Sequence, residues 1–455
     1  MHTGVIAVVS AMSGTIKADG TTSRLLSAAQ NSIDQKCFEE DLRKIEDLHM
    51  EIVYGGFQKP QVRESARNVV FEEIKELRRF LESLRVIREI SGRSLDRIVG
   101  CGERLSANLV SASLNDKDIP SFPVDLSNLV DSVDVGKAGY RNDLIRAVKS
   151  EMETRLSEDN ENAVPVLTGF FGHVEGGILD GVGRGYTDLT SAITASALSA
   201  DSLQVWKESD GVFTGNPTKI DTARLVSHVS PREAAELTYF GNEVLHPYTM
   251  ETAIEAKIPV QILNTFKPDG KGTVVDPNRY TSLCSDEATG GVNDSPATAV
   301  CSKKNVCLLN LTSNRKLGSF KFLSRVFEVF MRHEVKVDLV STTEVSLSVT
   351  INESTPVELV ERAMQELEAF GECDLKTDRA IVSLIGEGMR KTRGMAAEMF
   401  STLADQNVNI EMIAQGSSEV NISVVVGADD AELAVKSLHT NFFERGSDVD
   451  ECVGA

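Results

Sequence analysis

The stretch AVPVLTGFFG (163–172), followed by GVGRGYTDLTSAITASAL (181–198), decides the fold of the first part of this chain. The first piece is typical of a buried β-strand that runs into a loop, because its apolar residues are continuous. The second piece is a glycine-rich loop that opens an alanine-rich apolar helix, which we expect to begin at about Leu189. A strand, a glycine-rich loop and a helix in this order indicate an α/β protein with a largely parallel sheet.

Strand-like runs and helix-like patterns alternate through residues 1–280. The strand-like runs are 4–13, 202–215 and 257–264, and the helix-like patterns are 21–33, 60–90 and 230–241. In residues 60–90 the apolar residues recur at spacings of three and four, and Ser230 with Glu233 predicts a capping box at the start of the last helix. Residues 96–110, DRIVGCGERLSANLV, indicate a helix end, a glycine turn and a new helix. The pattern therefore predicts a three-layer αβα domain, with a mainly parallel sheet covered by helices on both faces.

An internal repeat of about 73 residues, measured from Phe327 to Phe400, occupies the last third of the chain. Each copy follows the order strand–helix–strand–strand–helix, and residues 373–377 could supply a last strand to the first copy. This order predicts two small ferredoxin-like α+β domains. The expected boundaries are 281–304 for a Gly-, Ser-, Thr- and Pro-containing linker, 305–378 and 379–445 for the two domains, and 446–455 for a tail.

The bulk composition argues against several classes of function. The 455 residues carry a formal net charge of −21, which disfavours binding to nucleic acids or to anionic membranes. Seven cysteines are dispersed without a CxxC pair and seven histidines lie far apart, so we expect a reducing, cytoplasmic environment and no metal site. The chain has no run of about 18 apolar residues that would indicate a membrane span.

The loop at 181–188 has two interpretations. Its glycines permit positive φ and close approach of a ligand to the backbone, and the N–H groups at the start of the following helix favour an anion. Arg184 adds a planar guanidinium suited to a carboxylate, and Asp188 could bind an ammonium group or position a metal-bound phosphate. The alternative is a tight turn with a surface arginine, in which Thr187 or Asp188 merely caps the helix.

Three other loops also combine polar residues with the ends of strands or helices. They are SAMSGTIKADGTTSRL (10–25), CGERLSA (101–107) and WKESDGVFTGNP (206–217). Glu103, in the second loop, either faces a ligand or is an ordinary first-turn acid favoured by the helix dipole. Ligands of parallel sheets bind at the carboxyl ends of the strands, where such loops converge. Taken together, the four loops suit an amino-acid substrate beside a nucleotide.

At these motifs the sequence resembles the amino-acid kinase family, and within it the fungal type of aspartokinase with tandem ACT domains. The motifs are VVSAMSGTIKADGTTSRLL, CGERLS, TGFFG, GVGRGYTDLT, QVWKESDGVFTGNP, ELTYFGNEVLHPYTM and NIEMIAQGSSEVNIS. The resemblance implies that ATP, with Mg²⁺, phosphorylates the side-chain carboxylate of L-aspartate to give ADP and 4-phospho-L-aspartate. This is the first step toward threonine, methionine and homoserine. The repeats resemble ACT domains, which bind effector amino acids, here threonine, and help to form homo-oligomers.

The resemblance also implies roles for individual residues around the substrate. Arg184 would bind the α-carboxylate of aspartate, and Glu103 would bind its amino group. Thr22 and Phe170 would line the substrate pocket. Asp188 would orient the reacting groups as a catalytic residue.

Further roles follow for the phosphoryl group, the nucleotide and the effector. Ser10 would lie near the transferring phosphoryl group as a second catalytic residue. Lys207, Glu208 and Phe213 would neighbour the nucleotide. The candidate effector-binding residues are Asp338, Ser341 and Thr342 in the first repeat and Asn409, Ile410 and Gln415 in the second. The alternative for these six residues is that they simply close pairs of strands.

Two departures from the family pattern bear on activity. The family normally opens with a strand and the loop Lys-Phe-Gly-Gly-Thr-Ser, whose lysine stabilises the transferring phosphoryl group, and this loop is absent here. We therefore expect an N-terminally incomplete version of an active kinase, and the alternative is a catalytically impaired chain that only senses or binds amino acids. The nucleotide turn ends in Asn216-Pro217-Thr218 where the family has Asp-Pro-Arg, which alters an expected ATP contact. A kinase acting on glutamate or a nucleotide fits the repeat less well.

Overall fold

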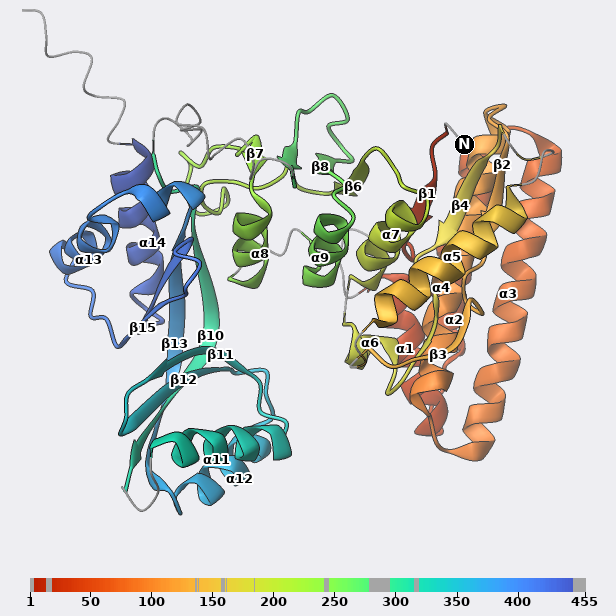
Figure 1. Cartoon of the computed structure of the whole chain (residues 1–455). Helices are drawn as coiled ribbons and strands as arrows, with labels where there is room; N and C mark the ends of the chain where they lie inside the picture. The colour runs from red at the N-terminus through yellow and green to blue at the C-terminus, as the bar shows by residue number, and fades with distance from the viewer. Residues whose placement is uncertain are drawn as a thin grey trace, which may run out of the picture. The chain divides into compact units, whose positions relative to one another are not determined.

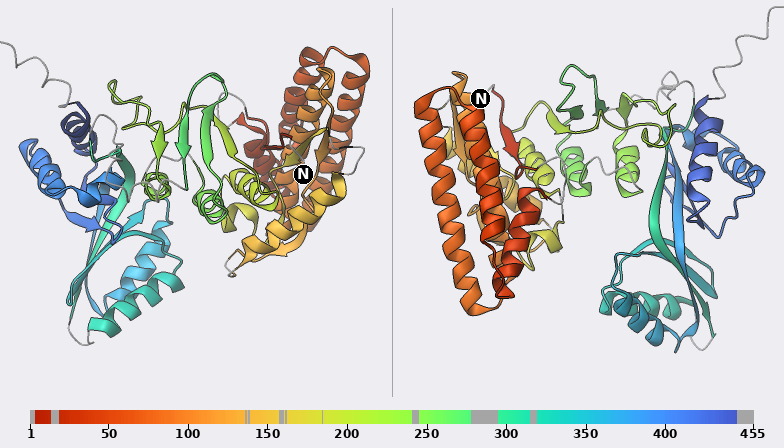
Figure 2. Two further views of the ribbon diagram at one scale, coloured as in Figure 1. Left: turned by 45° about the horizontal axis from the view of Figure 1, so that its top comes forward. Right: turned by 180° about the vertical axis from the view of Figure 1, so that it is seen from behind.

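The chain folds into two compact units. Unit 1 comprises Met1–Leu203 and Tyr248–Ile258, and unit 2 comprises Gln204–Pro247 and Pro259–Ala455. Figure 1 and Figure 2 show the elements of the computed structural model. The structure describes residues 4–13, 19–135, 137, 139–156, 160, 162–183, 185–240, 245–277, 295–314 and 319–444.

Unit 1 contains a parallel three-stranded sheet in the order β1–β4–β2, formed by Ala7–Val9, Val164–Thr168 and Ser121–Val124. Val9 pairs with Thr168 and Val124 with Leu167, so all three strands end at the same edge of the sheet. The larger helices of this unit are α1 (Thr21–Ile33), α2 (Glu39–Gly56), α3 (Pro60–Ile87), α4 (Gly92–Asp116), α5 (Tyr140–Arg155), α7 (Tyr186–Ala197) and α9 (Pro247–Glu255). β3 (Val130–Val133) and β5 (Gly172–Val174) form a separate parallel pair.

Helix α4 lies between two hydrophobic cores. Ile98 and Leu105 pack with α1, α2 and α3, whereas Val99 packs with the sheet and with α5 and α7. The predicted break near residue 101 is wrong, because α4 is continuous. A Cβ on Gly100 would come within 2.7 Å of the Phe170 ring, and a Cβ on Gly102 within 2.9 Å of Ala11. The two glycines therefore permit close packing on either side of the helix, and they do not form a turn.

Asp96 of α4 fixes the loop that leads to the short helix α6 (Ile178–Gly181). Its two carboxylate oxygens accept hydrogen bonds from the backbone N–H groups of Ile178 (2.7 Å) and Val174 (3.2 Å). The Asp96 side chain is 1% exposed, and burial raises its pKa while these two hydrogen bonds lower it. One buried carboxylate thus anchors both ends of the segment between β5 and α6.

Unit 2 begins with a mixed four-stranded sheet in the order β6–β8–β9–β7. The strands are Leu203–Lys207, Val260–Asn264, Thr273–Val275 and His228–Val229. β8 and β9 are antiparallel, so this sheet departs from the parallel arrangement of unit 1. The predicted capping box is confirmed at the start of α8 (Pro231–Tyr239), where the Ser230 hydroxyl accepts from Glu233 N–H and the Glu233 carboxylate accepts from Ser230 N–H.

The two repeats share one six-stranded antiparallel sheet in the order β11–β12–β10–β13–β15–β14. β10 (Ala299–Ser313) and β13 (Gly371–Ile385) are each 15 residues long and pair along most of their length. The other strands are β11 (Val337–Thr342), β12 (Ser346–Asn352), β14 (Met412–Gln415) and β15 (Asn421–Gly427). We call the part with β11 and β12 the first repeat domain and the part with β14 and β15 the second.

The structure differs from the expected domain boundaries. β10 begins at Ala299, inside the expected linker, and its residues 299–303 pair with Ile381–Ile385 in the second repeat domain. The expected last strand of the first domain and first strand of the second are one strand, β13. The second repeat domain is therefore completed by chain that precedes the first, an interleaving that the repeat in the sequence does not reveal.

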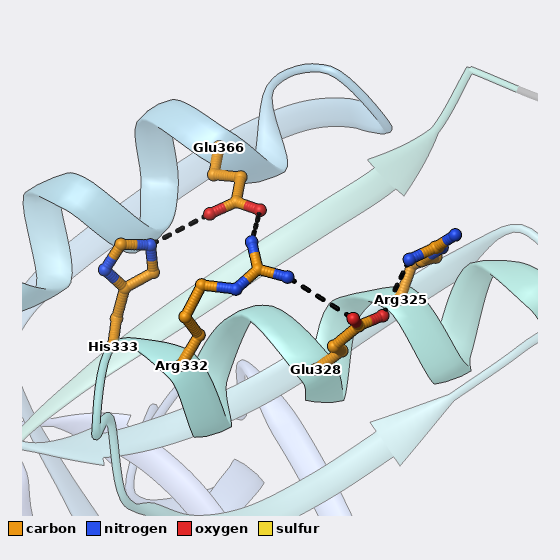
Figure 3. Close-up of polar contacts among 5 residues, drawn as sticks. All are labelled: Arg325, Glu328, Arg332, His333 and Glu366. Atoms are coloured by element: carbon orange, nitrogen blue, oxygen red, sulfur yellow. Dashed lines mark hydrogen bonds and ion pairs between the residues drawn. The ribbon is translucent and has the colours of Figure 1, made fainter.

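Helices cover one face of each repeat domain (Figure 1). α11 (Ser319–Arg332) and α12 (Val357–Leu367) belong to the first, and α13 (Met395–Asp405) and α14 (Ala431–His439) to the second. An exposed ion-pair network joins α11 to α12: Glu366 binds both Arg332 and His333, and Arg332 also binds Glu328 at 3.3 Å (Figure 3). The hydrogen bond from His333 is the main cause that lowers the Glu366 pKa. Exposed pairs of this kind contribute little to stability.

The structure describes five of the seven cysteines, and all five are free thiols: Cys37, Cys101, Cys301, Cys307 and Cys373. Among the residues that the structure describes, no helix combines the length and the apolar character needed to cross a bilayer.

We predict that Asp96→Ala destabilises unit 1 by roughly 2–4 kcal/mol, because two buried backbone N–H groups lose their acceptors. Urea denaturation followed by far-ultraviolet circular dichroism measures the change. Glu175→Ala removes an exposed carboxylate from the same loop and serves as the control. Equal midpoints for the two variants would contradict the anchoring role of Asp96.

Candidate functional site

Glu103 is the centre of a polar cluster in unit 1. It lies in the middle of α4, and its side chain is 1% exposed. The Thr187 hydroxyl of α7 donates to Glu103 Oε1 at 3.2 Å, whereas Oε2 is buried and has no hydrogen-bond partner among the described residues. A buried carboxylate oxygen without a donor is costly, so it is a natural acceptor for a ligand N–H or ammonium group.

Burial raises the pKa of Glu103 to about 7. The hydroxyl of Tyr186, the backbone of Phe170 and the hydroxyl of Thr187 offset part of the shift. The carboxylate therefore changes charge near neutral pH, and a bound cation would favour its charged form. The prediction that Glu103 starts a helix is wrong, because α4 begins at Gly92.

The predicted glycine loop is present, although its helix starts earlier than expected. Gly183 and Gly185 both have φ of +95°, and α7 begins at Tyr186, not near Leu189. Gly185 is the N-cap residue and no side chain caps the helix, so the interpretation of Thr187 or Asp188 as the cap is wrong. Thr187 instead reaches Glu103.

Gly169 explains how Thr187 can approach Glu103. A Cβ at Gly169 would lie 2.4 Å from Thr187 Oγ1, which only glycine avoids. The backbone N–H of Gly169 donates to the carbonyl of Val9 at 3.0 Å, so this glycine also joins the ends of β1 and β4. Thr187 and Gly169 were not predicted as site residues, because the sequence shows neither their contact nor the position of α4.

The other predicted substrate residues of unit 1 lie on elements that meet at α4. Ser10 follows β1 and is exposed, and Thr22 is half-buried in the first turn of α1. Phe170 is 1% exposed and packs on Gly100. Asp188 is half-buried in the first turn of α7, one residue after Thr187. Arg184 lies outside the described residues.

Thr21 is a further candidate that sequence reasoning missed. It precedes Thr22, is 0% exposed, and its hydroxyl has no hydrogen-bond partner among the described residues. Its methyl group would lie 3.0 Å from a Cβ on Gly102, next to Glu103. The sequence offers two adjacent threonines here, and only the orientation of α1 shows which one faces α4.

A cavity of about 620 Å³ lies along α3 and α4 in unit 1. Its lining includes Arg97, Arg104, Ser127 and His173, and it reaches the predicted substrate residues only at Phe170. Arg104 is engaged with Glu73 of α3 at 3.0 Å. Neither Glu103 nor Asp188 lines this cavity, so it is distinct from the polar cluster around Glu103.

The predicted nucleotide residues belong to unit 2. Lys207 ends β6, and its carbonyl accepts from Thr265 N–H at 2.9 Å. The exposed Glu208 follows it, and Phe213 is half-buried opposite Leu225 in a short antiparallel bridge. These three residues thus lie at the end of one strand and in the hairpin that continues from it.

The turn that departs from the family pattern has its own internal hydrogen bonds. Asn216 Oδ1 accepts from the backbone N–H of Thr218 at 2.9 Å and from its hydroxyl at 2.7 Å. The side chain of Asn216 therefore stabilises the turn around Pro217. Thr218 is exposed and lacks the charge of the arginine that the resemblance implies at this position.

The effector candidates of the first repeat domain lie on β11. Asp338 is half-buried, and its carboxylate is 2.7 Å from Lys303 Nζ of β10. Ser341 pairs with Ser348 of β12. The Thr342 hydroxyl donates to the carbonyl of Ser346 at 3.2 Å, as expected for a residue that closes a strand pair.

The candidates of the second repeat domain lie on and before β14. Asn409 and Gln415 are exposed, and Gln415 pairs with Ile422 of β15. Ile410 packs against the hydrophobic core of this domain. Cα atoms of β11 and β14 lie within 8 Å of one another, so the two strands that carry the first set of candidates and Gln415 approach each other.

Comparison with known proteins adds an independent finding. A model described as the amino acid kinase family matches residues 5–264, and one described as an ACT domain matches residues 382–442. The chain is 38% identical to the aspartokinase of Candida albicans over 470 aligned residues, which cover 98% of this chain and 86% of that protein.

Solved structures show the same similarity in three dimensions. The structure of E. coli aspartokinase III in complex with aspartate and ADP, in the R-state, is 25% identical and has a TM-score of 0.75, covering 96% of this chain and 93% of that one. The T-state structure of the same enzyme, in complex with lysine and aspartate, has a TM-score of 0.70 at 25% identity, with the same coverage of 96% and 93%.

We predict that Glu103→Gln changes how stability depends on pH. The folded pKa of about 7 lies above the ordinary value of 4.5, so the wild type loses stability as the pH rises from about 4.5 to 7. The glutamine variant lacks this loss and should gain up to roughly 3 kcal/mol relative to wild type across the window. Urea midpoints from pH 4.5 to 8 measure it. Glu82→Gln, an exposed change on α3, is the control, and parallel curves for wild type and Glu103→Gln would contradict the prediction.

Proposed function

This chain belongs to the aspartokinases of the amino acid kinase family, and from that premise we propose that it phosphorylates the side-chain carboxylate of L-aspartate with ATP. In this reaction a carboxylate oxygen of aspartate attacks the γ-phosphorus, and the bond from that phosphorus to the bridging oxygen of ADP breaks. The products are 4-phospho-L-aspartate and ADP. Both reactants are anions, so positioning and charge neutralisation supply most of the catalysis.

The observation that carries the proposal is the buried Glu103 carboxylate. Its free oxygen, Oε2, suits the α-ammonium group of aspartate, while Thr187 holds the other oxygen. A carboxylate with a pKa of about 7 is ready to become fully charged when an ammonium group arrives. In this proposal Arg184 binds the α-carboxylate of aspartate, and Phe170 and Thr22 line the substrate pocket.

The remaining catalytic assignments concern the moving phosphoryl group and the nucleotide. Ser10 follows the end of β1, and Asp188 lies in the first turn of α7, beside Thr187. In this proposal Ser10 lies near the transferring phosphoryl group, and Asp188 orients the reacting groups. The nucleotide is bound beside Lys207, Glu208 and Phe213.

Mg²⁺ enters the proposal as part of the MgATP substrate. Among the residues that the structure describes, no group of three or more His, Cys, Asp or Glu side chains could hold a metal ion. The chemistry that MgATP brings is neutralisation of phosphate charge. The chain's own contribution is to bind and orient aspartate and the nucleotide.

The repeat domains are proposed as the regulatory part. Their candidates on β11 and β14 come together, which suits a shared effector site. We propose L-threonine as the effector, a homo-oligomer formed through these domains, and a cytoplasmic role in the first step toward threonine and methionine. An amino acid at this site would be recognised by a carboxylate such as that of Asp338, which is already balanced by Lys303.

We predict that Glu103→Gln raises the KM for aspartate by about 10- to 100-fold, because a neutral amide loses a charge-assisted hydrogen bond to the substrate ammonium. The KM for ATP should stay within about twofold of the wild type. A hydroxamate assay, which traps the acyl phosphate, measures both constants. Glu73→Gln on the neighbouring helix, whose carboxylate binds Arg104, is the control.

Two outcomes would contradict the proposal. The first is a wild-type protein that forms no aspartate-dependent hydroxamate and shows no calorimetric binding of aspartate. The second is a Glu103→Gln variant whose KM for aspartate equals that of wild type. Calorimetry separates binding from phosphoryl transfer, so a loss of transfer alone does not hide the role of Glu103.

A further inference from the structure

The candidate nucleotide residue Phe213 belongs to a hairpin, residues 212–226, whose two arms are joined by backbone hydrogen bonds on either side of it. Val226 N–H donates to Val212 O at 2.8 Å, and Thr214 N–H donates to Arg224 O at 2.9 Å. Phe213 lies between these two hydrogen bonds, opposite Leu225. Whatever holds the hairpin therefore also holds Phe213.

The His439 side chain forms a hydrogen bond to this hairpin. This histidine ends α14 of the second repeat domain and is 0% exposed. Its Nε2 lies 2.9 Å from Thr214 Oγ1, and its Nδ1 lies 3.0 Å from Glu444 Oε1. Thr214 Oγ1 also accepts from Arg224 N–H at 3.0 Å. The imidazole thus bridges the hairpin and the last described turn of the chain.

The hydrogen bonds fix one tautomer of His439. The Glu444 carboxylate can only accept, so Nδ1 must carry the proton, and Nε2 is left to accept from the Thr214 hydroxyl. The oxygen of the Thr214 hydroxyl accepts from Arg224 N–H, and its proton is donated to Nε2. Burial lowers the pKa of His439 and nearby Arg224 lowers it further, whereas Glu444 raises it. In the neutral ring Nδ1 donates to Glu444 and Nε2 accepts from Thr214, so both ring nitrogens have a partner.

Further contacts join the hairpin to the same short segment. The Thr222 hydroxyl donates to the Glu444 carboxylate, and the Arg224 guanidinium donates to the carbonyl of Phe443. Glu444 and Phe443 belong to η5 (Thr440–Glu444), a π-helical turn that directly follows His439. Such turns are rare and are often found at functional sites.

Apolar packing places the hairpin inside the second repeat domain. Ile220, near the hairpin tip, belongs to the same buried cluster as Leu438 and Phe442, and the effector candidate Ile410 packs against that cluster. A Cβ on Gly215 would lie 3.1 Å from His439 Cδ2. The hairpin and the regulatory core are therefore packed as one body, with the imidazole against the backbone of the hairpin.

We propose that His439 is a positioning residue for the hairpin that carries Phe213, and that its hydrogen bond to Thr214 holds this hairpin in the conformation that binds ATP. The inference rests on the proposed function, because it assumes that Phe213 neighbours the nucleotide. Without the Thr214–His439 hydrogen bond the hairpin keeps fewer contacts to the second repeat domain, so Phe213 is held less firmly and the affinity for ATP falls.

Two substitutions at one position separate the two hydrogen bonds. The amide of His439→Gln can place its oxygen where Nε2 lies, which preserves the acceptor for Thr214. The shorter amide of His439→Asn can reach Glu444 but not Thr214. His49→Asn is the matched control, because His49 is also 0% exposed but lies on α2 in unit 1.

We predict that His439→Asn raises the KM for MgATP about fivefold, the effect of losing one hydrogen bond, whereas kcat and the KM for aspartate stay within about twofold. His439→Gln should lie closer to wild type. Amide hydrogen exchange at residues 212–226 should be faster in His439→Asn than in wild type and in His49→Asn.

Thr214→Val provides a second variant should His439→Asn fail to fold. It removes the hydroxyl with little change of shape, and it also removes the acceptor of Arg224 N–H, so it should raise the KM for MgATP at least as much as His439→Asn. The double variant should be no worse than Thr214→Val alone, because that substitution already removes the hydrogen bond to His439. Unchanged KM for MgATP in both single variants, despite faster exchange in the hairpin, would overturn the inference.

Failure of the proposed function is distinguishable from failure of this inference. If wild type forms no acyl phosphate from aspartate and does not bind aspartate, the proposed function fails. The role of His439 is then judged by calorimetric binding of ADP. A dissociation constant for ADP that is raised in His439→Asn and restored in His439→Gln supports it, and equal constants for wild type and His439→Asn overturn it.

Discussion

The burial of α4 is the constraint on which unit 1 depends. A helix between two hydrophobic cores has most of its middle turns out of water, so each polar residue on its buried faces needs a partner or raises the cost of folding. Asp96 satisfies this need with backbone N–H groups, whereas Glu103 satisfies it only in part, through Thr187. Under the proposed function, the oxygen of Glu103 that has no partner is the one that receives the substrate ammonium group. The same burial raises the Glu103 pKa toward neutrality, so the proposed binding role and the pH dependence of stability involve one carboxylate.

Long-range pairing plays the corresponding role in unit 2. β10 and β13 each serve both repeat domains, so neither domain has a complete sheet without the other's chain. Val300 of β10 also donates its N–H to the carbonyl of Thr214 at 2.8 Å. The hairpin with Phe213 is thus hydrogen-bonded to β10 as well as to His439. These hydrogen bonds connect it to the second repeat domain.

Local patterns in the sequence were sufficient for much of the fold. The apolar spacing in residues 60–90 matches α3, and Ser230 with Glu233 forms the predicted capping box. These features depend on residues three or four apart. The prediction of a break in α4 was wrong because the sequence does not distinguish a glycine that forms a turn from one that permits close packing of a neighbour such as Phe170. Thr187 and His439 were missed for a related reason: their partners are 84 and 225 residues away, and no local pattern records such distances.

The two sets of candidates are held by different interactions. The aspartate candidates lie on α4, α7 and neighbouring elements of unit 1, where tight glycine contacts leave little room for adjustment. The hairpin with Phe213 instead depends on hydrogen bonds to His439 and η5, and on the packing of Ile220 in the core of the second repeat domain. Under the proposed function, loss of the hydrogen bond between Thr214 and His439 therefore changes the affinity for the nucleotide and leaves the aspartate residues in place.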